Sequence, residues 1–479
     1  MHNIVCSVKG LIEEEMVLVH NLPKHVHFVG AGGAGMSGLA LILLGMGHHV
    51  SGTDLKDSSS LDRLRDLGAD IAIGHAAERI GGAELVVISS AIPPVNPEVL
   101  EAHERGIPVI KRGEMLAYLM MRKRGIAVAG SHGKTTTTSM MALVLEKNGL
   151  DPTIVVGGEV SDIGGNAKLG SGEYLVAEAD ESDGSFLWLQ PEIAIVTNIE
   201  NDHLDYYGSK ENIEKAFEKF IHSVPKHGVT VLYHNDISLK KIIPAIKGHY
   251  VTYAPTNPSA NYYMENIVFN SRFSEGDVYY QGKRLGTLRL SVPGEHNLTN
   301  ALGVIAAGKS LGLDFHGMAR SLKCFKGVGR RFQTLVHENG IWVVDDYAHH
   351  PTEIRATLKA ARQTNNGRVI CVFQPHRYSR TRLLSDEFGG AFGDADLVVL
   401  NEIYGAGERP VEGVTAKLIS DAIAENNGPD VVYIKELNDI PGYLADIVAA
   451  GDLIITMGAG DIFNAGLDFV KKLKGEINV

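Results

Sequence analysis

Cysteine is scarce in this sequence, with three (Cys6, Cys324 and Cys371) among 479 residues. They lie far apart and form no CxxC pair, which argues against a disulfide framework or a zinc site and favours a reducing cytoplasm. Long apolar runs are also missing. The longest near the amino terminus, residues 16–19, is far too short to span a bilayer. The glutamates at 13–15 are unlike a signal peptide, so no membrane insertion is expected.

The chain also lacks an excess of basic residues. Its formal net charge is −12 and its pI is about 5.9. A partner rich in phosphates, such as nucleic acid or an anionic membrane, would need clustered Lys and Arg. Neither partner is therefore expected, whereas a phosphorylated small molecule needs only a few local donors. For the assembly we expect a monomer or a homodimer.

The sequence does contain a repeated theme of a short apolar strand, a turn rich in glycine or acid, and a helix. It occurs after residues 25–29 and after residues 126–129, and more weakly around 343–346 and 368–373. Strands that alternate with helices predict an α/β fold with parallel, doubly wound sheets. At roughly 150 residues per domain, the length suggests about three domains.

Further strands and the domain boundaries follow from the same pattern. Residues 250–293 alternate in short, turn-rich runs, which predicts a small antiparallel insert at the end of the middle domain. More buried strands are predicted at 50–54, 85–90, 174–178, 193–197, 397–400 and 453–456. The expected parts are an extension of unassigned role at 1–23, a Rossmann-like domain at 24–124, a central domain with a parallel sheet at 125–333, and a Rossmann-like C-terminal α/β domain at 334–479.

The first glycine-rich turn fits a diphosphate-binding loop. Gly30, Gly32 and Gly35 form G-x-G-x-x-G directly after a strand and at the start of a helix. Without a Cβ the loop amides can approach a diphosphate, and the helix N-terminus adds partial positive charge. Asp54 follows about 20 residues later, where a dinucleotide enzyme holds a ribose hydroxyl. The motif does not separate NAD from a nucleotide sugar, and a purely structural turn is the third reading.

The second glycine-rich turn, residues 130–138, is more specific because it contains Gly-Lys-Thr. In a P-loop, Lys134 would reach the terminal phosphates of a nucleotide and the Thr135 hydroxyl would bind Mg²⁺. The first glycine is Gly130 and position 128 is Val128, so the loop is tighter than the usual G-x-x-x-x-G-K. This turn predicts that the central domain binds ATP.

Acidic residues and one histidine follow two predicted strands of the central domain. Glu178 ends one strand, Glu181 and Asp183 lie just beyond it, and His203 follows the next strand. The carboxyl ends of parallel strands meet in one crevice. Thr135 and Glu178 supply the hard oxygens that Mg²⁺ prefers. We expect them to hold one Mg²⁺ and His203 to bind a second.

Five spaced motifs together resemble the Mur ligase family, which forms amide bonds in peptidoglycan precursor synthesis. In chain order they are residues 130–138, 198–203, 294–300, 329–332 and 345–351. Within that family, residues 30–36 and 373–381 are similar to the branch that adds alanine.

The resemblance implies an ATP-dependent ligase that joins L-alanine to the carboxylate of UDP-N-acetylmuramate through an acyl phosphate, with ATP and Mg²⁺ as cofactors. The implied catalytic residues are Lys134, His203, Arg331, His349, His350, Arg377 and Arg380. The implied ATP-binding residues are Gly130, Ser131, His132, Gly133, Lys134, Thr135, Thr136, Asn297, Asn300, Arg331 and Asp346. The implied UDP-sugar contacts are Gly30, Gly32, Gly33, Gly35, Met36, Asp54, His75 and Ser90. Tyr347, His349, His376, Arg377 and Arg380 are implied for the amino acid, and Thr135, Glu178 and His203 for the metal.

Three other functions stay open at the level of sequence. A ligase that attaches a preformed tripeptide to the same sugar shares the UDP-muramate end. An NAD-dependent oxidoreductase explains Gly30 to Asp54 but leaves the P-loop unused. A regulatory or transport ATPase explains Lys134 and Thr135 but not the first loop. Some family members carry a carbamylated lysine past the metal histidine, and we do not predict one at 215–219.

Overall fold

The computed structural model describes residues 22–160, 164–270 and 273–475. The predicted extension at 1–23 therefore lies almost wholly outside the described residues. Two compact units are present: the first runs to Tyr253 and includes Gly303–Leu313, and the second comprises Ala254–Leu302 and Asp314–Val479. In the described ranges no helix combines the length and apolar character needed to cross a membrane.

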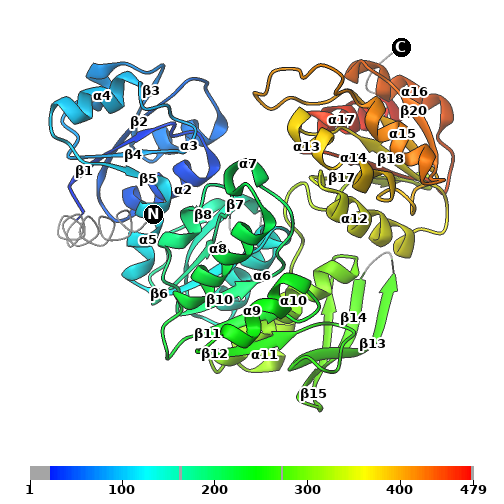
Figure 1. The fold of residues 1–479 in the computed structure, drawn as a ribbon, viewed down its shortest axis with the longest axis horizontal. Helices are drawn as coiled ribbons and strands as arrows, with labels where there is room; N and C mark the ends of the chain where they lie inside the picture. The colour runs from blue at the N-terminus through cyan, green and yellow to red at the C-terminus, as the bar shows by residue number, and fades with distance from the viewer. Residues whose placement is uncertain (1–21, 161–163, 271–272, 476–479) are drawn as a thin grey trace. The chain divides into compact units, whose positions relative to one another are not determined.

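The first unit begins with a parallel sheet in the order β3-β2-β1-β4-β5 (Figure 1). Its strands are β1 (His25–Val29), β2 (His49–Asp54), β3 (Asp70–Ile73), β4 (Leu85–Ile88) and β5 (Val109–Lys111). Its helices are α2 (Ala34–Gly45), α3 (Ser59–Asp66), η1 (Ala77–Ile80), α4 (Pro97–Glu104) and α5 (Arg112–Met121). The strand order reverses between β1 and β4, and the first glycine loop leaves β1 at this switch point, where ligands bind in doubly wound folds.

The second sheet of this unit runs in the order β12-β11-β10-β6-β9-β7-β8. The strands are β6 (Arg124–Ala129), β7 (Thr153–Val160), β8 (Gly165–Lys168), β9 (Tyr174–Glu178), β10 (Ile193–Val196), β11 (Val229–Tyr233) and β12 (His249–Tyr253). The helices are α6 (Lys134–Lys147), η3 (Ser185–Trp188), α7 (Leu204–Tyr207), α8 (Lys210–His222), α9 (Ile237–Ile242) and η4 (Ile243–Ala245). Pairing is parallel except between β7 and β8.

The second unit holds the antiparallel strands β13 (Tyr262–Asn270), β14 (Phe273–Tyr280) and β15 (Lys283–Leu290), with α11 (Phe315–Lys323) against β15. The helix α10 (Glu295–Ser310) starts in this unit. The predicted insert is confirmed but begins later than expected. Residues 249–253 form β12, which pairs parallel with β11 because it follows α9 in a crossover connection rather than a hairpin.

A third sheet, in the order β16-β17-β21-β18-β19-β20, fills the rest of the second unit. Its strands are β16 (Gln333–Glu338), β17 (Ile341–Asp346), β18 (Val369–Phe373), β19 (Leu397–Leu400), β20 (Asp430–Tyr433) and β21 (Leu453–Met457). Its helices are α12 (Pro351–Thr364), α13 (Tyr378–Leu383), α14 (Ser385–Gly389), α15 (Lys417–Glu425), η5 (Leu437–Asp439), α16 (Ile440–Ile447) and α17 (Ile462–Leu473). Only the edge strand β16 pairs antiparallel.

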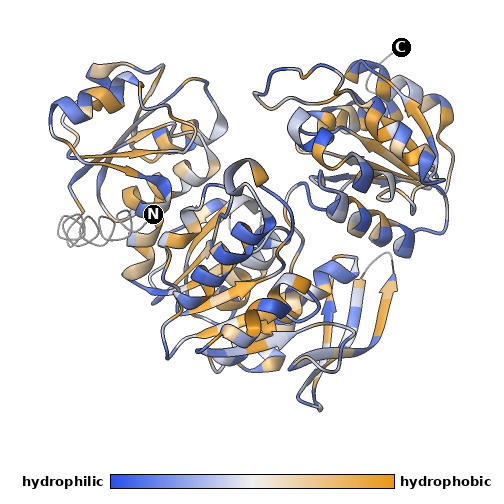
Figure 2. Cartoon of the chain, in the orientation of Figure 1, coloured by the Kyte–Doolittle hydropathy of each residue, from blue (hydrophilic) through white to orange (hydrophobic). Residues whose placement is uncertain are grey.

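Strand β18 of the third sheet is buried on both of its faces. All five of its residues are buried. Val369, Cys371 and Phe373 pack in one apolar cluster, whereas Ile370 and Val372 pack in another on the opposite face. A strand buried on both faces reads as a continuous apolar run, which is the pattern of parallel sheets. The central strands are accordingly hydrophobic along their length (Figure 2).

The α/β fold class is confirmed, and so are the individual strands predicted in all three sheets. The core of the first unit includes an aromatic cluster between η3 and α8. Phe186 lies 5.1 Å, centroid to centroid, from both Phe217 and Phe220, and all three side chains are fully buried.

We expect Phe217→Ala to destabilise the protein by about 3–5 kcal/mol, because it removes a large ring and leaves a cavity that the neighbouring rings cannot fill. Urea unfolding followed by intrinsic fluorescence measures this. The control is Leu187→Ala in η3, whose side chain is 39% exposed, and we expect it to change stability by less than about 1 kcal/mol. Equal effects of the two substitutions would contradict this packing.

Candidate active site

The first glycine loop is tied to the ends of β1 and β2 by its own backbone. Gly30 has φ +82°, and the N–H groups of Gly30 and Ala31 donate to the Thr53 carbonyl at 2.8 and 2.9 Å. The Gly32 N–H donates to Asp54 Oδ2 at 2.9 Å. A Cβ on Gly32 would lie 3.0 Å from that oxygen. Asp54, predicted to hold a ribose, is therefore placed directly against the loop.

The helix α2 that follows begins without a side-chain cap. Its N-cap is Gly33, so no side chain competes for the first-turn amides, which can bind an anion. Of the other residues predicted to contact the UDP-sugar, Gly35 lies in this first turn and Ser90 is exposed just past β4. Met36 is 1% exposed and belongs to the apolar core.

His75 is held by a buried polar network that the sequence did not reveal. The Thr53 hydroxyl donates to Glu98 Oε2 at 2.7 Å, and His75 Nδ1 lies 2.9 Å from the same hydroxyl oxygen. Because the Thr53 hydroxyl proton is donated to Glu98, the hydroxyl can only accept from His75, so His75 must carry its proton on Nδ1. Burial alone would raise the pKa of Glu98, but His27, 3.5 Å away, and Thr53 hold that pKa below its ordinary value. The network fixes the orientation of the His75 ring.

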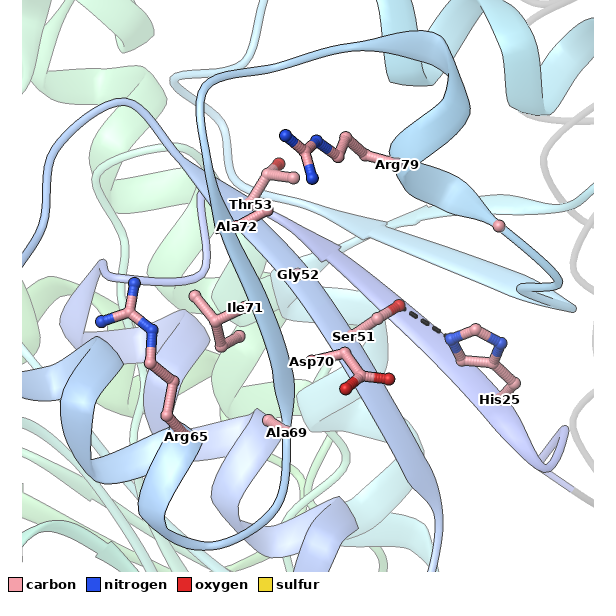
Figure 3. A pocket seen from close by; sticks show the side chains of 11 residues that line it. His25, Ser51, Gly52, Thr53, Arg65, Ala69, Asp70, Ile71, Ala72 and Arg79 are labelled. Atoms are coloured by element: carbon pink, nitrogen blue, oxygen red, sulfur yellow. Dashed lines mark hydrogen bonds between the residues drawn. The ribbon is translucent and has the colours of Figure 1, made fainter.

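A cavity of about 470 Å³ opens beside this network (Figure 3). At its edge His25 Nε2 lies 2.7 Å from Ser51 Oγ. Its lining residues are His25, Ser51, Gly52, Thr53, Arg65, Ala69, Asp70, Ile71, Ala72, Arg79 and Gly81. None of the predicted UDP-sugar contacts is among them, and charges of both signs face the cavity. It is therefore separate from the glycine-loop site.

The second glycine loop connects β6 to α6 and is anchored to the segment after β10. Gly130 has φ +134° and Gly133 has φ +82°, both in the region that favours glycine. A Cβ on Gly130 would lie 2.1 Å from Thr197 Oγ1. The Ser131 and His132 amides donate to the carbonyl and side-chain oxygens of Asn198 at 3.1 and 2.8 Å. The loop is thus held open at the carboxyl end of the sheet.

Lys134 lies inside this loop. Its Nζ donates to the carbonyls of Gly130 and Ser131 at 2.6 and 3.2 Å and to Glu181 Oε1 at 2.8 Å. Burial works against the ammonium, but the charges of Glu181 and Glu178 outweigh it and raise the pKa of Lys134. Lys134 is therefore charged at neutral pH and placed at the centre of the loop, as a phosphate-binding lysine must be. The adjacent Thr136 is buried.

The predicted metal ligands lie on the same edge of the sheet. Thr135 Oγ1 donates to both oxygens of Glu178 at 3.0 and 3.2 Å, and the Gly157 N–H donates to Glu178 Oε2 at 2.8 Å. His203 Nε2 lies 3.8 Å from Glu181 Oε1. The other oxygen of Glu181 is buried with no hydrogen-bond partner in the described parts of the chain. Carboxylate and hydroxyl oxygens of this kind fit Mg²⁺.

In the second unit the predicted residues gather around Glu353, which sequence reasoning missed. Its Oε1 lies 3.3 Å from Arg331 Nη1, and its Oε2 lies 3.4 Å from His349 Nδ1 and accepts from the His349 N–H at 3.1 Å. Glu353 is also the third residue of α12, in a capping box with His350. The spacing of His350, Pro351 and Glu353 is a helix-start signature that could have revealed it.

His349 is a neutral histidine whose side chain is 16% exposed. Its Nδ1 lies 2.9 Å from the Tyr347 carbonyl, which fixes the proton on that nitrogen. Burial lowers the pKa of His349 to about 3, against the opposing effect of Glu353 and with the help of the Arg380 charge. The ring packs edge-on against His376, with centroids 5.4 Å apart. Its Nε2 is left as an acceptor.

Two arginines follow β18, as predicted. Arg380 Nη1 donates to His376 Nδ1 at 3.1 Å, and the His376 ring stacks on Tyr404 at 5.9 Å. Arg377 has φ +70°, and its N–H donates to the Tyr404 carbonyl at 2.8 Å. The Arg377 Nε is buried and has no hydrogen-bond partner among the described residues. A buried donor in this state suits an anionic group of a ligand.

Two neighbouring arginines, Arg330 and Arg331, lie just before β16 and have different polar partners. Arg330 Nε donates to Asp345 Oδ2 at 3.0 Å and its Nη2 to the Gly458 carbonyl at 2.7 Å. Both guanidinium groups lie over the Tyr347 ring, 5.1 Å from its centroid for Arg330 and 5.3 Å for Arg331. Arg330 therefore holds two strand ends together, while Arg331, the predicted phosphate ligand, faces Glu353 and Tyr347.

Asp346, Asn297 and Asn300 are all nearly buried. Asp346 accepts from the Ala348 and Phe332 amides at 2.7 and 2.8 Å, and burial raises its pKa to about 6. The two asparagines lie three residues apart in α10, so they share a helix face. Asn297 donates to the Pro293 carbonyl at 2.6 Å. Their predicted contact with adenine stays a prediction.

We expect His349→Gln to reduce the loss of stability on acidification. The pKa of His349 is lower in the fold than its ordinary 6.5, so the unfolded chain binds a proton that the folded chain does not. Stability is retained above pH 6.5 and falls as the pH drops, by about 2 kcal/mol between pH 7 and pH 5. Urea unfolding at both pH values measures this difference. The exposed His316→Gln is the control, and identical pH dependence in the two variants would contradict a neutral His349.

Sequence profiles of one family match most of the chain. The profile described as "Mur ligase family, catalytic domain" matches residues 25–124, "Mur ligase middle domain" matches 128–308, and "Mur ligase, glutamate ligase domain" matches 330–460. A UDP-N-acetylmuramate–L-alanine ligase of Pelotomaculum thermopropionicum is 57% identical over 451 residues, covering 94% of this chain and 98% of the relative.

Solved structures give the same result. A UDP-N-acetylmuramate-alanine ligase of Thermotoga maritima superposes with a TM-score of 0.80 at 32% identity, covering 95% of this chain and all of that one. A murein peptide ligase of Psychrobacter arcticus, at 24% identity and a TM-score of 0.69 over 95% of this chain and all of that one, shares the fold. The profiles, the relatives and the two nucleotide-type glycine loops agree: the chain belongs to the Mur ligase family.

Proposed function

We propose that this protein is an ATP-dependent ligase that joins L-alanine to the carboxylate of UDP-N-acetylmuramate in peptidoglycan precursor synthesis. The observation that carries the proposal is the pair of phosphate-type loops in the first unit, one leaving β1 and one leaving β6 with Lys134 inside it. One loop serves a nucleotide diphosphate and the other a triphosphate, which is the substrate pair of such a ligase. The need for ATP places the reaction in the cytoplasm.

The chemistry explains why ATP is consumed. A carboxylate is a poor electrophile, so a carboxylate oxygen of the sugar attacks the γ-phosphorus and ADP leaves, forming an acyl phosphate. The amine of alanine then attacks the acyl carbon, inorganic phosphate leaves, and the nitrogen loses its proton as the amide forms. We assign to Lys134 the stabilisation of charge on the transferring phosphoryl group, because its ammonium is preorganised in the loop.

Thr135, Glu178 and His203 would hold Mg²⁺, and the unpartnered Glu181 oxygen beside them fits a cation. When bound, Mg²⁺ supplies Lewis-acid stabilisation of phosphoryl oxygens. The negative charge of Glu181 keeps the Lys134 ammonium protonated and in place. The Gly157 amide keeps the Glu178 carboxylate turned toward Thr135.

The second unit would bind the amino acid and the acyl group. We assign Arg377 and Arg380 to a carboxylate or acyl phosphate, because guanidinium groups pair well with planar anions. His349 is neutral with a low pKa, so we assign its Nε2 the role of a hydrogen-bond acceptor. Arg331, Asp346, Asn297 and Asn300 are assigned to ATP.

A tripeptide ligase of the same family is the nearest alternative. It is disfavoured because an alanine ligase is 57% identical over 94% of this chain, whereas murein peptide ligases of known structure are 24% identical over 95% of it and 30% identical over 64% of it. An NAD-dependent oxidoreductase would leave Lys134 and Glu181 without a purpose, and a simple ATPase would leave the first loop without one.

We expect phosphate release from ATP to require both UDP-N-acetylmuramate and L-alanine. A coupled phosphate assay compares no acceptor, L-alanine and the tripeptide. Release with the tripeptide but not with alanine would move the protein to the recycling branch. Release that is indifferent to the sugar would overturn the ligase proposal.

We expect Lys134→Ala to lower ligation by about 100–1,000-fold or more, because it removes a charge that acts on the transition state. Binding of UDP-N-acetylmuramate, measured by calorimetry, should be largely kept, since the first loop lies on a different sheet. The control is Lys147→Ala at the exposed end of the same helix, which should retain activity. Equal loss of sugar binding and ligation in Lys134→Ala would contradict separate sites.

A further inference from the structure

Arg112, the first residue of α5, is wedged between the two nucleotide-type sites of the first unit. A Cβ on Gly35, in the first turn of α2, would lie 2.8 Å from Arg112 Cδ. On the other side, a Cβ on Gly113 would lie 2.5 Å from the Ser185 Cβ of η3. Two glycines therefore allow α5 to approach both neighbours. The third glycine of the first loop makes room for an arginine.

The guanidinium of Arg112 reaches from the first loop toward the ATP side. Its Nη1 and Nε lie 3.1 and 3.4 Å from where a Gly35 Cβ would be, so the guanidinium lies against the first turn of α2. Its Nη2 donates to Asp180 Oδ2 at 3.0 Å and to Ser185 Oγ at 3.4 Å. The side chain is 18% exposed. This one cation thus adds to the positive charge at the N-terminus of α2 and also pairs with Asp180, which follows β9.

Asp180 links Arg112 to the turn that contacts the lysine of the second loop. Its other carboxylate oxygen accepts from the Ser182 amide at 3.1 Å, and its carbonyl accepts from the Phe186 amide at 3.1 Å, so it shapes the turn after β9. The next residue in that turn is Glu181, which pairs with Lys134 at 2.8 Å. Arg112 is therefore separated from the ATP-binding ammonium by two adjacent acids.

We propose that Arg112 is a positioning residue that couples the two sites, so that a bound UDP-sugar diphosphate strengthens the binding of ATP. This inference rests on the proposed function. The diphosphate charge beside α2 holds the guanidinium in place, and the guanidinium holds Asp180 and the turn that carries Glu181. A coupling of this kind is reciprocal, so ATP strengthens sugar binding by the same factor.

Calorimetry measures this coupling as the ratio of Kd for a non-hydrolysable ATP analogue without and with saturating UDP-N-acetylmuramate. For the unmodified protein we expect a ratio of about 5 or more, the lower end for coupled sites. Arg112→Met and Asp180→Asn should each bring the ratio close to 1, and the double variant should lower it no further. Arg112→Lys should restore part of the Kd ratio, because lysine has the positive charge but not the several N–H donors of the guanidinium.

Two controls separate this role from general loosening. Arg122→Met removes a cation from the far end of the same helix, where it donates to the Tyr118 hydroxyl. Asn166→Ala removes an uncharged link from β8 to α2, where the amide donates to the Ala34 carbonyl and to Ser37 Oγ at 3.1 Å. Both should keep the ratio of the unmodified protein, and all variants are checked by thermal melting.

A folded Arg112→Met protein that keeps the full ratio would overturn the proposal, as would equal loss in Asn166→Ala or a ratio of 1 in the unmodified protein. Each of these results leaves the ligase proposal standing, provided that the unmodified protein turns over UDP-N-acetylmuramate and L-alanine. Failure of that turnover is a failure of the proposed function instead.

Discussion

The largely buried ammonium of Lys134 is the charge around which the second glycine loop is arranged. Taking such a charge out of water costs several kcal/mol unless partners surround it. The partners are two loop carbonyls and Glu181, and Glu181 is held in turn because the Tyr207 hydroxyl donates to its carbonyl at 2.6 Å. The loop is therefore charged and shaped before any nucleotide enters. The charge and its acceptors are preorganised, which is the arrangement that the proposed binding of a phosphate at this loop requires.

The sequence was most informative where chemistry and chain order coincide. Strand, loop and lysine are adjacent in the chain, so the loop at Gly130 and the strand ends at Glu178 and His203 could be predicted from local pattern. Arg112 could not, because its role depends on a partner 68 residues away. Glu353 was missed although the helix-start spacing from His350 to Glu353 is local and could have revealed it. The late start of the antiparallel insert was missed for the same reason as Arg112: parallel and antiparallel pairing of β12 differ only in the tertiary partner.

The second unit shows how burial selects a role for a histidine. His349 has a carboxylate, Glu353, nearby, which alone would favour the charged ring. Desolvation and the Arg380 charge outweigh it, and the Nδ1–H of the neutral ring donates a hydrogen bond to the Tyr347 carbonyl. A ring kept neutral at pH 7 presents a lone pair and resists taking up a proton. The His-His pair in the sequence could not distinguish an acceptor from a base, because the difference lies in the surroundings.

The three glycines of the first loop have three separate structural reasons. Gly30 adopts a positive φ, Gly32 makes room for the Asp54 carboxylate, and Gly35 makes room for the Arg112 stem. The reasons for Gly30 and Gly32 lie within the turn and the next strand, so this part of G-x-G-x-x-G can be shared by NAD and nucleotide-sugar sites. The reason for Gly35 lies outside the turn. What packs against Gly35 here is a cation that pairs with Asp180 in the turn after β9. This glycine therefore depends on a partner beside another sheet of the first unit, which the local pattern does not contain.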